Sequence, residues 1–195
     1  MSTKSKIYFV DGNVVAQSGD VKIYLMDNQL FLEIGPGHNL WALESEYAVY
    51  MDQLRGKPFG NCLEVGLGLG IASRCILTYP NVRHLTTIEK NNDVIEAHDK
   101  IVPLLNNKLT KWIPYDNNKH TIINDDGLHY LTTSKEVYDF IFIDFYKQID
   151  EDTLPDIKDI VTAGKKCLSE KGIIMGWLDP FTPPEFYKEF ENIFI

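Results

Sequence analysis

From Asn61 onward, short apolar runs alternate with segments of helical length, and this alternation most constrains the fold. Five runs are rich in Ile, Leu, Val, Phe and Thr: CLEV, HLTTIE, HTIIN, YDFIFID and GIIMGW. Strands that alternate with helices predict right-handed βαβ units around a mostly parallel sheet. We therefore expect an α/β fold with a doubly wound sheet and with helices over 69–79, 91–105, 126–134 and 153–168.

At the start of the chain, apolar runs are separated by turn residues instead of segments of helical length. Apolar runs at 6–10, 21–26 and 29–34 are separated by turn residues, among them Asp27-Asn28. Such pairs join antiparallel strands. We expect a small antiparallel β-hairpin unit over residues 1–40.

The remaining residues, 41–195, are then expected to form the α/β domain. Apolar groups at helical spacing predict that this domain opens with a helix over 41–54. At its end, PEFYKEFEN predicts a last short helix, and the final IFI leaves room for at most one strand closing the sheet. An uncovered sheet edge presents unpaired backbone N–H and C=O groups that can bond to another chain, so we expect a homodimer.

The composition and the net charge of the chain argue against several classes of binding partner. The chain has 195 residues and a formal net charge of −9, which argues against binding to nucleic-acid phosphates. No stretch reaches the length of a membrane span, and the histidines do not group as metal ligands, so we expect neither a membrane partner nor a metal site. Three cysteines without CxxC spacing, Cys62, Cys75 and Cys167, predict reduced, buried thiols and a cytoplasmic protein.

A glycine-rich stretch completes the first run and leads into the first helix. It reads Glu64-Val65-Gly66-Leu67-Gly68-Leu69-Gly70. Glycines let a ligand lie against bare backbone, and the following helix offers free N–H groups. Glu89 ends the next run, about 20 residues on, where an acidic residue takes ribose hydroxyls. The pair favours a nucleoside site over a plain strand-to-helix turn.

Acidic residues also follow the third and fourth runs. Ligands bind beyond the carboxyl ends of parallel strands, and Asp126 and Asp144 fall at such ends. Asp126 either accepts a hydrogen bond from an amine such as that of adenine or caps a helix. Asp144 requires a cation or a polar ligand, because an unpaired charge beside apolar walls is costly.

Over about 58–180, these motifs resemble the class I S-adenosylmethionine-dependent methyltransferases. The resemblance implies a Rossmann-like fold, C-terminally short, and S-adenosylmethionine as the bound cofactor. A nicotinamide site is disfavoured because GxGxxG would need a glycine at Ile71. The residues that the resemblance assigns to the cofactor are Glu64, Gly66, Gly68, Gly70, Glu89, Asp126 and Gly127.

One branch of this superfamily, guanidinoacetate methyltransferase, is similar in YDFIFIDFY and in ESEYAVYM. That resemblance implies that Asp144 and one of Glu44 or Glu46 hold a cationic amine or guanidine. Asp144 would take the proton of the amine or orient its lone pair, while Tyr146 and Tyr47 form the acceptor wall. The alternative for the two tyrosines is plain packing.

A second branch, the spermidine synthases, is similar in its N-terminal β unit and in Asp125-Asp126-Gly127. The chain departs from that family at Leu69 and Lys147, where the family carries carboxylates. We therefore expect an S-adenosylmethionine-dependent methyltransferase acting on a small amine or guanidine. An aminopropyltransferase using decarboxylated S-adenosylmethionine, with a polyamine acceptor, and a non-catalytic adenosyl-binding module remain as alternatives.

Overall fold

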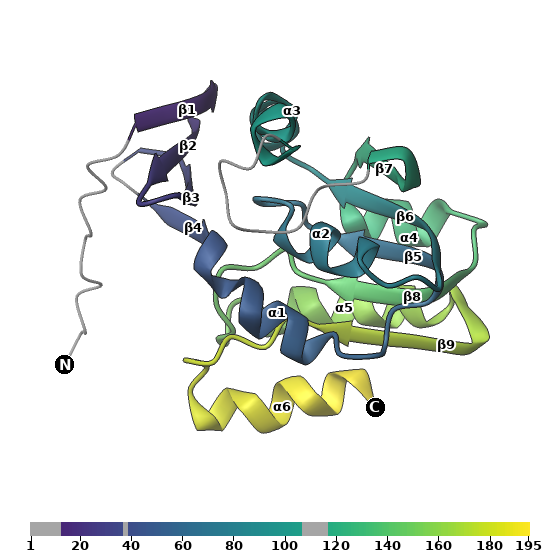
Figure 1. The fold of residues 1–195 in the computed structure, drawn as a ribbon. Coiled ribbons are helices and arrows are strands. Elements are labelled where there is room, and N and C mark those ends of the chain that lie inside the picture. Colours follow the sequence, from purple (N-terminus) through teal and green to yellow (C-terminus); the bar gives the residue numbers. More distant parts are fainter. Residues whose placement is uncertain (1–12, 37–38, 107–116) are drawn as a thin grey trace.

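The computed structural model describes residues 13–36, 39–106 and 117–195, and these residues form two sheets (Figure 1). The first sheet is an antiparallel meander in the order β1-β2-β3-β4. Its strands are β1 (Asn13–Ser18), β2 (Val21–Met26), β3 (Gln29–Ile34) and β4 (Leu40–Leu43). Asp27 and Asn28 join β2 to β3 with φ values of 51° and 62°, as a tight hairpin turn requires.

The expected helix over 41–54 is wrong in its first part. Residues 41–43 belong to β4, whose Leu43 pairs with Phe31 of β3. A 3-10 turn, η1 (Glu44–Glu46), follows, and the helix α1 itself runs only from Tyr47 to Gln53. Hydrogen bonding to β3 overrides the helical spacing of the side chains. The run at 6–10 lies outside the described residues, and the division at residue 40 stays a prediction.

The second sheet is parallel and confirms the expected α/β fold. Its strand order is β7-β6-β5-β8-β9, so β5, the first of these strands in the sequence, lies at the centre. The chain adds β6 and β7 on one side of β5 and then β8 and β9 on the other. Its strands are β5 (Gly60–Val65), β6 (Val82–Glu89), β7 (His120–Asn124), β8 (Tyr138–Ile143) and β9 (Leu168–Gly176). The connecting helices are α2 (Ile71–Leu77), α3 (Asn92–Asn106), α4 (Gly127–Thr133) and α5 (Leu154–Lys165), and η2 (Asn117–Lys119) precedes β7.

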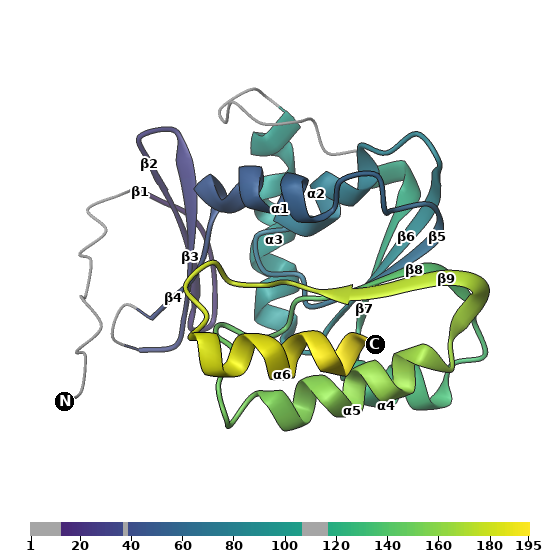
Figure 2. The same ribbon diagram turned by 90° about the horizontal axis from the view of Figure 1, so that it is seen from below.

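Helices cover both faces of the parallel sheet. Figure 2 shows α1 and α2 on one face and α4, α5 and α6 (Pro184–Phe194) on the other, while α3 runs across the level of the sheet. This arrangement explains why β8 is apolar from Phe140 to Ile143, since these four residues are all fully buried. The three cysteines are buried and free, as expected.

No antiparallel strand closes the parallel sheet among the described residues. Ile193 and Phe194, which the sequence left available for such a strand, lie in α6. The ring of Phe190 packs edge-on against Tyr146, which docks α6 beside β9. The homodimer stays a prediction. In the part of the chain that the structure describes, no helix is long and apolar enough to cross a membrane.

Side-chain contacts join the antiparallel sheet to helices of the α/β domain. The hydroxyl of Ser18 at the end of β1 donates to Glu96 of α3 at 2.7 Å. Behind β4, Arg74 of α2 forms a fully buried ion pair with Glu44 at 3.0 Å. The small sheet therefore stands over the carboxyl ends of the parallel strands, where the sequence places its candidate ligands.

Candidate active site

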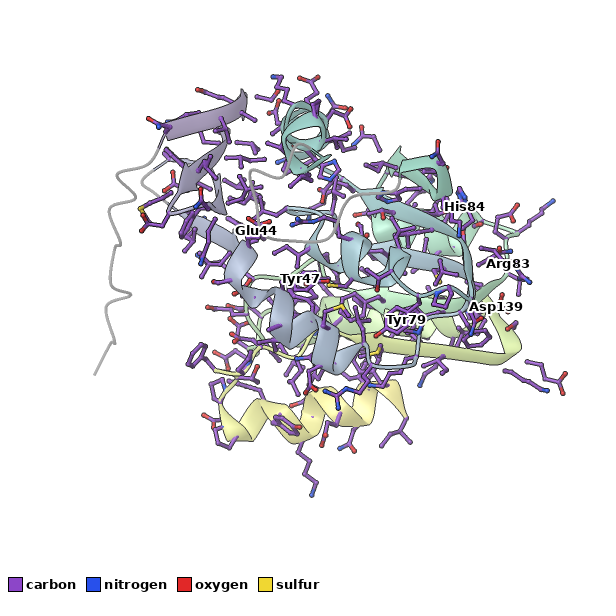
Figure 3. All side chains as sticks on the ribbon, viewed as in Figure 1. Glu44, Tyr47, Tyr79, Arg83, His84 and Asp139 are labelled. Carbon is purple, nitrogen blue, oxygen red and sulfur yellow. The ribbon has the colours of Figure 1, made fainter. Side chains whose placement is uncertain are left out.

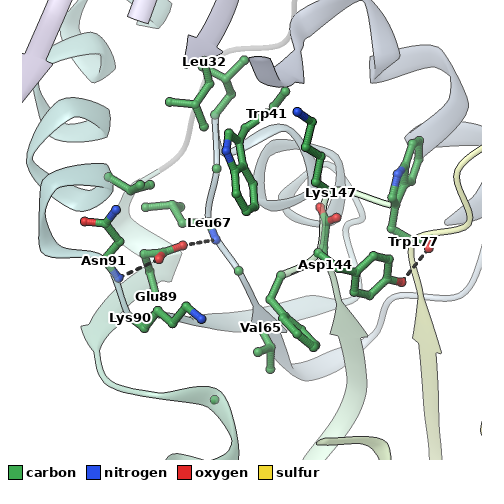
Figure 4. A pocket seen from close by; sticks show the side chains of 18 of the residues that line it. Leu32, Trp41, Val65, Leu67, Glu89, Lys90, Asn91, Asp144, Lys147 and Trp177 are labelled. Carbon is green, nitrogen blue, oxygen red and sulfur yellow. Dashed lines mark hydrogen bonds between the residues drawn. The ribbon is translucent and has the colours of Figure 1, made fainter. Parts of the chain in front are cut away.

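A cavity of about 750 Å³ lies between the two sheets. This volume is typical of small-molecule sites. Its floor is the glycine-rich loop, and its roof includes Leu32 and Trp41 from the antiparallel sheet (Figure 4). Ile34 and the exposed Phe181 also line the cavity. The cavity thus occupies the place where doubly wound sheets bind ligands.

The glycine loop brings the ends of two strands together. Gly66 has φ of 99°, and a Cβ there would lie 2.2 Å from the backbone oxygen of Asp144. Gly70 has φ of 67° at the start of α2, and a Cβ there would lie 2.6 Å from His98 Nε2. Both positions need glycine for conformation and for space. Gly66 and Gly68 line the cavity, whereas Gly70 lies behind it.

Glu89 is held rigidly at one end of the cavity. Its Oε2 accepts a hydrogen bond from the backbone N–H of Leu67 at 3.0 Å, and its Oε1 accepts one from Asn91 at 2.8 Å (Figure 4). A carboxylate oxygen can accept more than one hydrogen bond, so both oxygens retain capacity for ligand hydroxyls.

Asp126 caps α4 and also lines the cavity. Its Oδ1 accepts hydrogen bonds from the N–H groups of Leu128 and His129, each at 3.0 Å. Asp126 is therefore the N-cap of α4, which was one of the two alternatives from the sequence, and a single oxygen, Oδ1, accepts both hydrogen bonds. Gly127 follows it in the cavity wall, and a Cβ there would come within 2.5 Å of Val65.

Asp144 lies just beyond β8 with its carboxylate held by a tyrosine that sequence reasoning missed. The hydroxyl of Tyr50 donates to Asp144 Oδ2 at 2.8 Å, and the Tyr50 ring stacks on Trp177 with centroids 3.8 Å apart. Desolvation raises the pKa of Asp144 well above its ordinary value, the Tyr50 hydrogen bond opposes this, and the negative charges of Glu64 and Glu46 add to the rise.

Two further carboxylates, Glu46 and Asp179, line the same cavity as Asp144. Glu46 accepts a hydrogen bond from the N–H of Leu43 at 3.3 Å, and Asp179 follows β9. Burial raises the pKa of Glu46, the Leu43 bond opposes this, and the charge of Asp179 raises it further. Three acids, Glu46, Asp144 and Asp179, therefore line one region, which we call the acidic wall. Such a wall attracts a cationic ligand.

Four of the sequence-predicted residues do not line the cavity. Glu44 is fully buried in its ion pair with Arg74, and Tyr47 is buried on α1; Figure 3 labels both where the antiparallel sheet meets α1. Glu64 is fully buried and accepts hydrogen bonds from Ser73 and from Thr87. These side chains, with Gly70, support the loop and helices beneath the site rather than contacting the cavity.

Tyr146 lines the cavity with its ring, but its hydroxyl is used within the fold. That hydroxyl donates to the backbone oxygen of Trp177 at 2.6 Å (Figure 4). The structure thus brings together Glu46, Gly66, Gly68, Glu89, Asp126, Gly127, Asp144 and Tyr146. It adds Tyr50, Trp177 and Asp179, which sequence reasoning missed. The spacing of four residues between Glu46 and Tyr50, which places both on one helical face, was the available signal for Tyr50.

The fold and the cavity define a Rossmann-like protein with a candidate ligand site whose wall is acidic on one side. The sequence model of the spermine/spermidine synthase domain matches residues 46–177. The chain therefore belongs to the spermine/spermidine synthase family.

Individual relatives agree with this assignment. Polyamine aminopropyltransferase of Bacillus subtilis is 30% identical over 124 residues, which cover 63% of this chain and 43% of that protein. The Bacillus cereus protein of the same name is 28% identical over 139 residues, 69% of this chain and 48% of the relative. The chain spans about half the length of the curated relatives it matches.

Solved structures show the same fold. Spermidine synthase from Thermotoga maritima superposes with a TM-score of 0.65 at 20% identity, covering 91% of this chain and 61% of that one. A spermidine synthase in complex with the transition-state analogue AdoDATO gives 0.63 at 19% identity, covering 89% and 59%.

These findings overturn the preference for a methyltransferase. The matching family and relatives are aminopropyltransferases, the alternative that the sequence had left in second place. Leu69 and Lys147 are therefore departures within the family and do not place the chain outside it. Inferring methyl transfer from one apolar side chain in the loop was wrong.

Proposed function

We propose that this cavity catalyses the transfer of an aminopropyl group from decarboxylated S-adenosylmethionine to a small amine. Membership of the spermine/spermidine synthase family supports the reaction class. The single observation that carries the proposal is the position of Asp144, which lies beside the glycine loop with a raised pKa and a tyrosine holding it.

The nucleoside end fits the adenosyl part of such a donor. Glu89 would accept hydrogen bonds from the ribose hydroxyls, and the free oxygen of Asp126 would accept one from the adenine amine. Gly66 and Gly68 leave the backbone open at the loop, where the sulfur would lie against it. When bound, the donor supplies a sulfonium whose neighbouring carbon is already activated for attack.

The acidic wall would select and prepare the acceptor. An ammonium group is attracted by Glu46, Asp144 and Asp179, but only a neutral amine can attack carbon. A carboxylate with a raised pKa is a better proton acceptor than an ordinary one, so Asp144 would take that proton. Tyr50 would keep the carboxylate aimed at the amine, and Trp177 would hold Tyr50 in place.

Product formation in an Asp144→Asn variant tests this role. Decarboxylated S-adenosylmethionine and putrescine are supplied, and spermidine is measured by mass. Loss of one positioned general base typically lowers the rate 10²- to 10⁴-fold. The matched control is Asp152→Asn, because Asp152 is exposed and does not line the cavity. Spermidine formation at equal rates in both variants would remove Asp144 from the mechanism.

A further inference from the structure

Along the glycine loop, Gly66 to Gly70, the cavity wall carries no carboxylate. Leu67 and Leu69 come from the loop, and Leu32 and Ile34 come from the antiparallel sheet above it. An ammonium group placed against this apolar surface would lose its hydration without gaining a partner, which is unfavourable.

Lys147 brings a positive charge to the same cavity, three residues after Asp144 (Figure 4). Its Nζ donates to Asn39 Oδ1 at 2.6 Å, which ties the loop after β8 to the segment before β4. Among the described residues, no carboxylate lies within ion-pair distance of this ammonium. The anchored lysine is therefore a cation without an anionic partner in that part of the protein.

The surroundings of Lys147 favour an anion beside it. An ammonium group has three N–H donors, and Asn39 takes one of them. Desolvation lowers the pKa of Lys147, so its charged form is disfavoured until an opposite charge compensates. A second ammonium from a ligand would instead be repelled from this corner.

From this arrangement we infer that Lys147 binds a carboxylate carried by one of the two substrates. The inference rests on the proposed function, because it concerns the ligands of the same transfer reaction. The carboxylate has two sources with the same chemistry: the methionine tail of a donor that has not been decarboxylated, or an acceptor that is an amino acid. In both, the amine faces the acidic wall while the carboxylate faces Lys147.

Binding measurements on matched ligand pairs test the inference. S-adenosylmethionine and its decarboxylated form differ only in the donor carboxylate, and ornithine and putrescine differ only in the acceptor carboxylate. Calorimetry on the wild type gives a ratio of dissociation constants for each pair, with methylthioadenosine present for the acceptors. In one pair the carboxylate-bearing member binds more tightly, and that pair identifies the source.

Lys147→Gln removes the charge and retains a hydrogen-bond donor for Asn39. It is expected to reduce that preference about tenfold or more, as for loss of a charged hydrogen bond. Lys90→Gln is the matched control, since Lys90 also lines the cavity but adjoins Glu89 at the nucleoside end. It is expected to leave the ratio unchanged.

Unchanged ratios in Lys147→Gln, or equal changes in both lysine variants, would overturn the inference. If transfer of the aminopropyl chain from the donor is then still observed, only the role of Lys147 is refuted. If the ratios change as expected but the donor transfers no aminopropyl chain, the proposed function is refuted and the carboxylate site is supported. Absence of binding by every ligand to the wild type removes both.

Discussion

Replacing Glu64 by Gln is expected to remove a large part of the pH dependence of stability. Glu64 is fully buried beneath the glycine loop, where Ser73 and Thr87 donate to its Oε2. Burial raises its pKa from 4.5 to about 7, the Ser73 and Thr87 hydrogen bonds oppose this, and the charge of Glu89 adds to the rise. The folded protein thus holds a proton that the unfolded chain releases at lower pH.

The magnitude of this effect is set by linkage. Because the folded pKa is the higher one, this stabilising contribution is complete below pH 4.5 and is lost as the pH rises to about 7. A shift of that size corresponds to about 3 kcal/mol in the free energy of unfolding.

Urea denaturation at pH values between 4.5 and 7.5 measures this loss. Glu64→Gln is expected to show a decline smaller by about 3 kcal/mol than that of the wild type, because an amide does not titrate. Glu191→Gln, an exposed glutamate on α6, is the control and should follow the wild type. The same slope in the wild type and in Glu64→Gln would refute the argument that burial keeps this carboxyl protonated.

Two other substitutions test the framework of the site. Arg74→Met leaves Glu44 buried without its ion-pair partner at 3.0 Å, so we expect a loss of about 3–5 kcal/mol in unfolding free energy, measured by denaturation. Adding Glu44→Leu to that variant should recover only part of the loss, because it removes the unpaired charge but leaves the buried N–H of Leu30 without its acceptor. Glu89→Ala is expected to abolish the rise in melting temperature that methylthioadenosine produces in the wild type. A rise that persists undiminished would place the ribose elsewhere.

The parallel sheet could be predicted because its signal is local. YDFIFID is almost wholly apolar, as expected of a strand covered on both faces, and its first six residues form β8. The four-residue strand β4 was missed because its pairing with β3, rather than its own spacing, decides its conformation. A short run at the start of a helical pattern carries too few residues to reveal this.

The acidic wall could be predicted only in part. Asp144 follows a recognisable strand, but Tyr50 and Trp177 reach it from distant parts of the chain, and no sequence spacing encodes their stacking. Glu64 was assigned to the cofactor because it opens the motif that resembles the methyltransferases. Neighbouring residues of a strand point to opposite faces, so Val65 lines the cavity while Glu64 faces α2 and β6.

The by-product nucleoside tests the central claim most directly. The wild-type protein is incubated with putrescine, ornithine and an equal mixture of S-adenosylmethionine and its decarboxylated form, and the nucleosides are separated by mass. Transfer of the chain on sulfur leaves methylthioadenosine from either donor, and this is the product we predict. Accumulation of the demethylated nucleosides without methylthioadenosine would show methyl transfer and contradict the account.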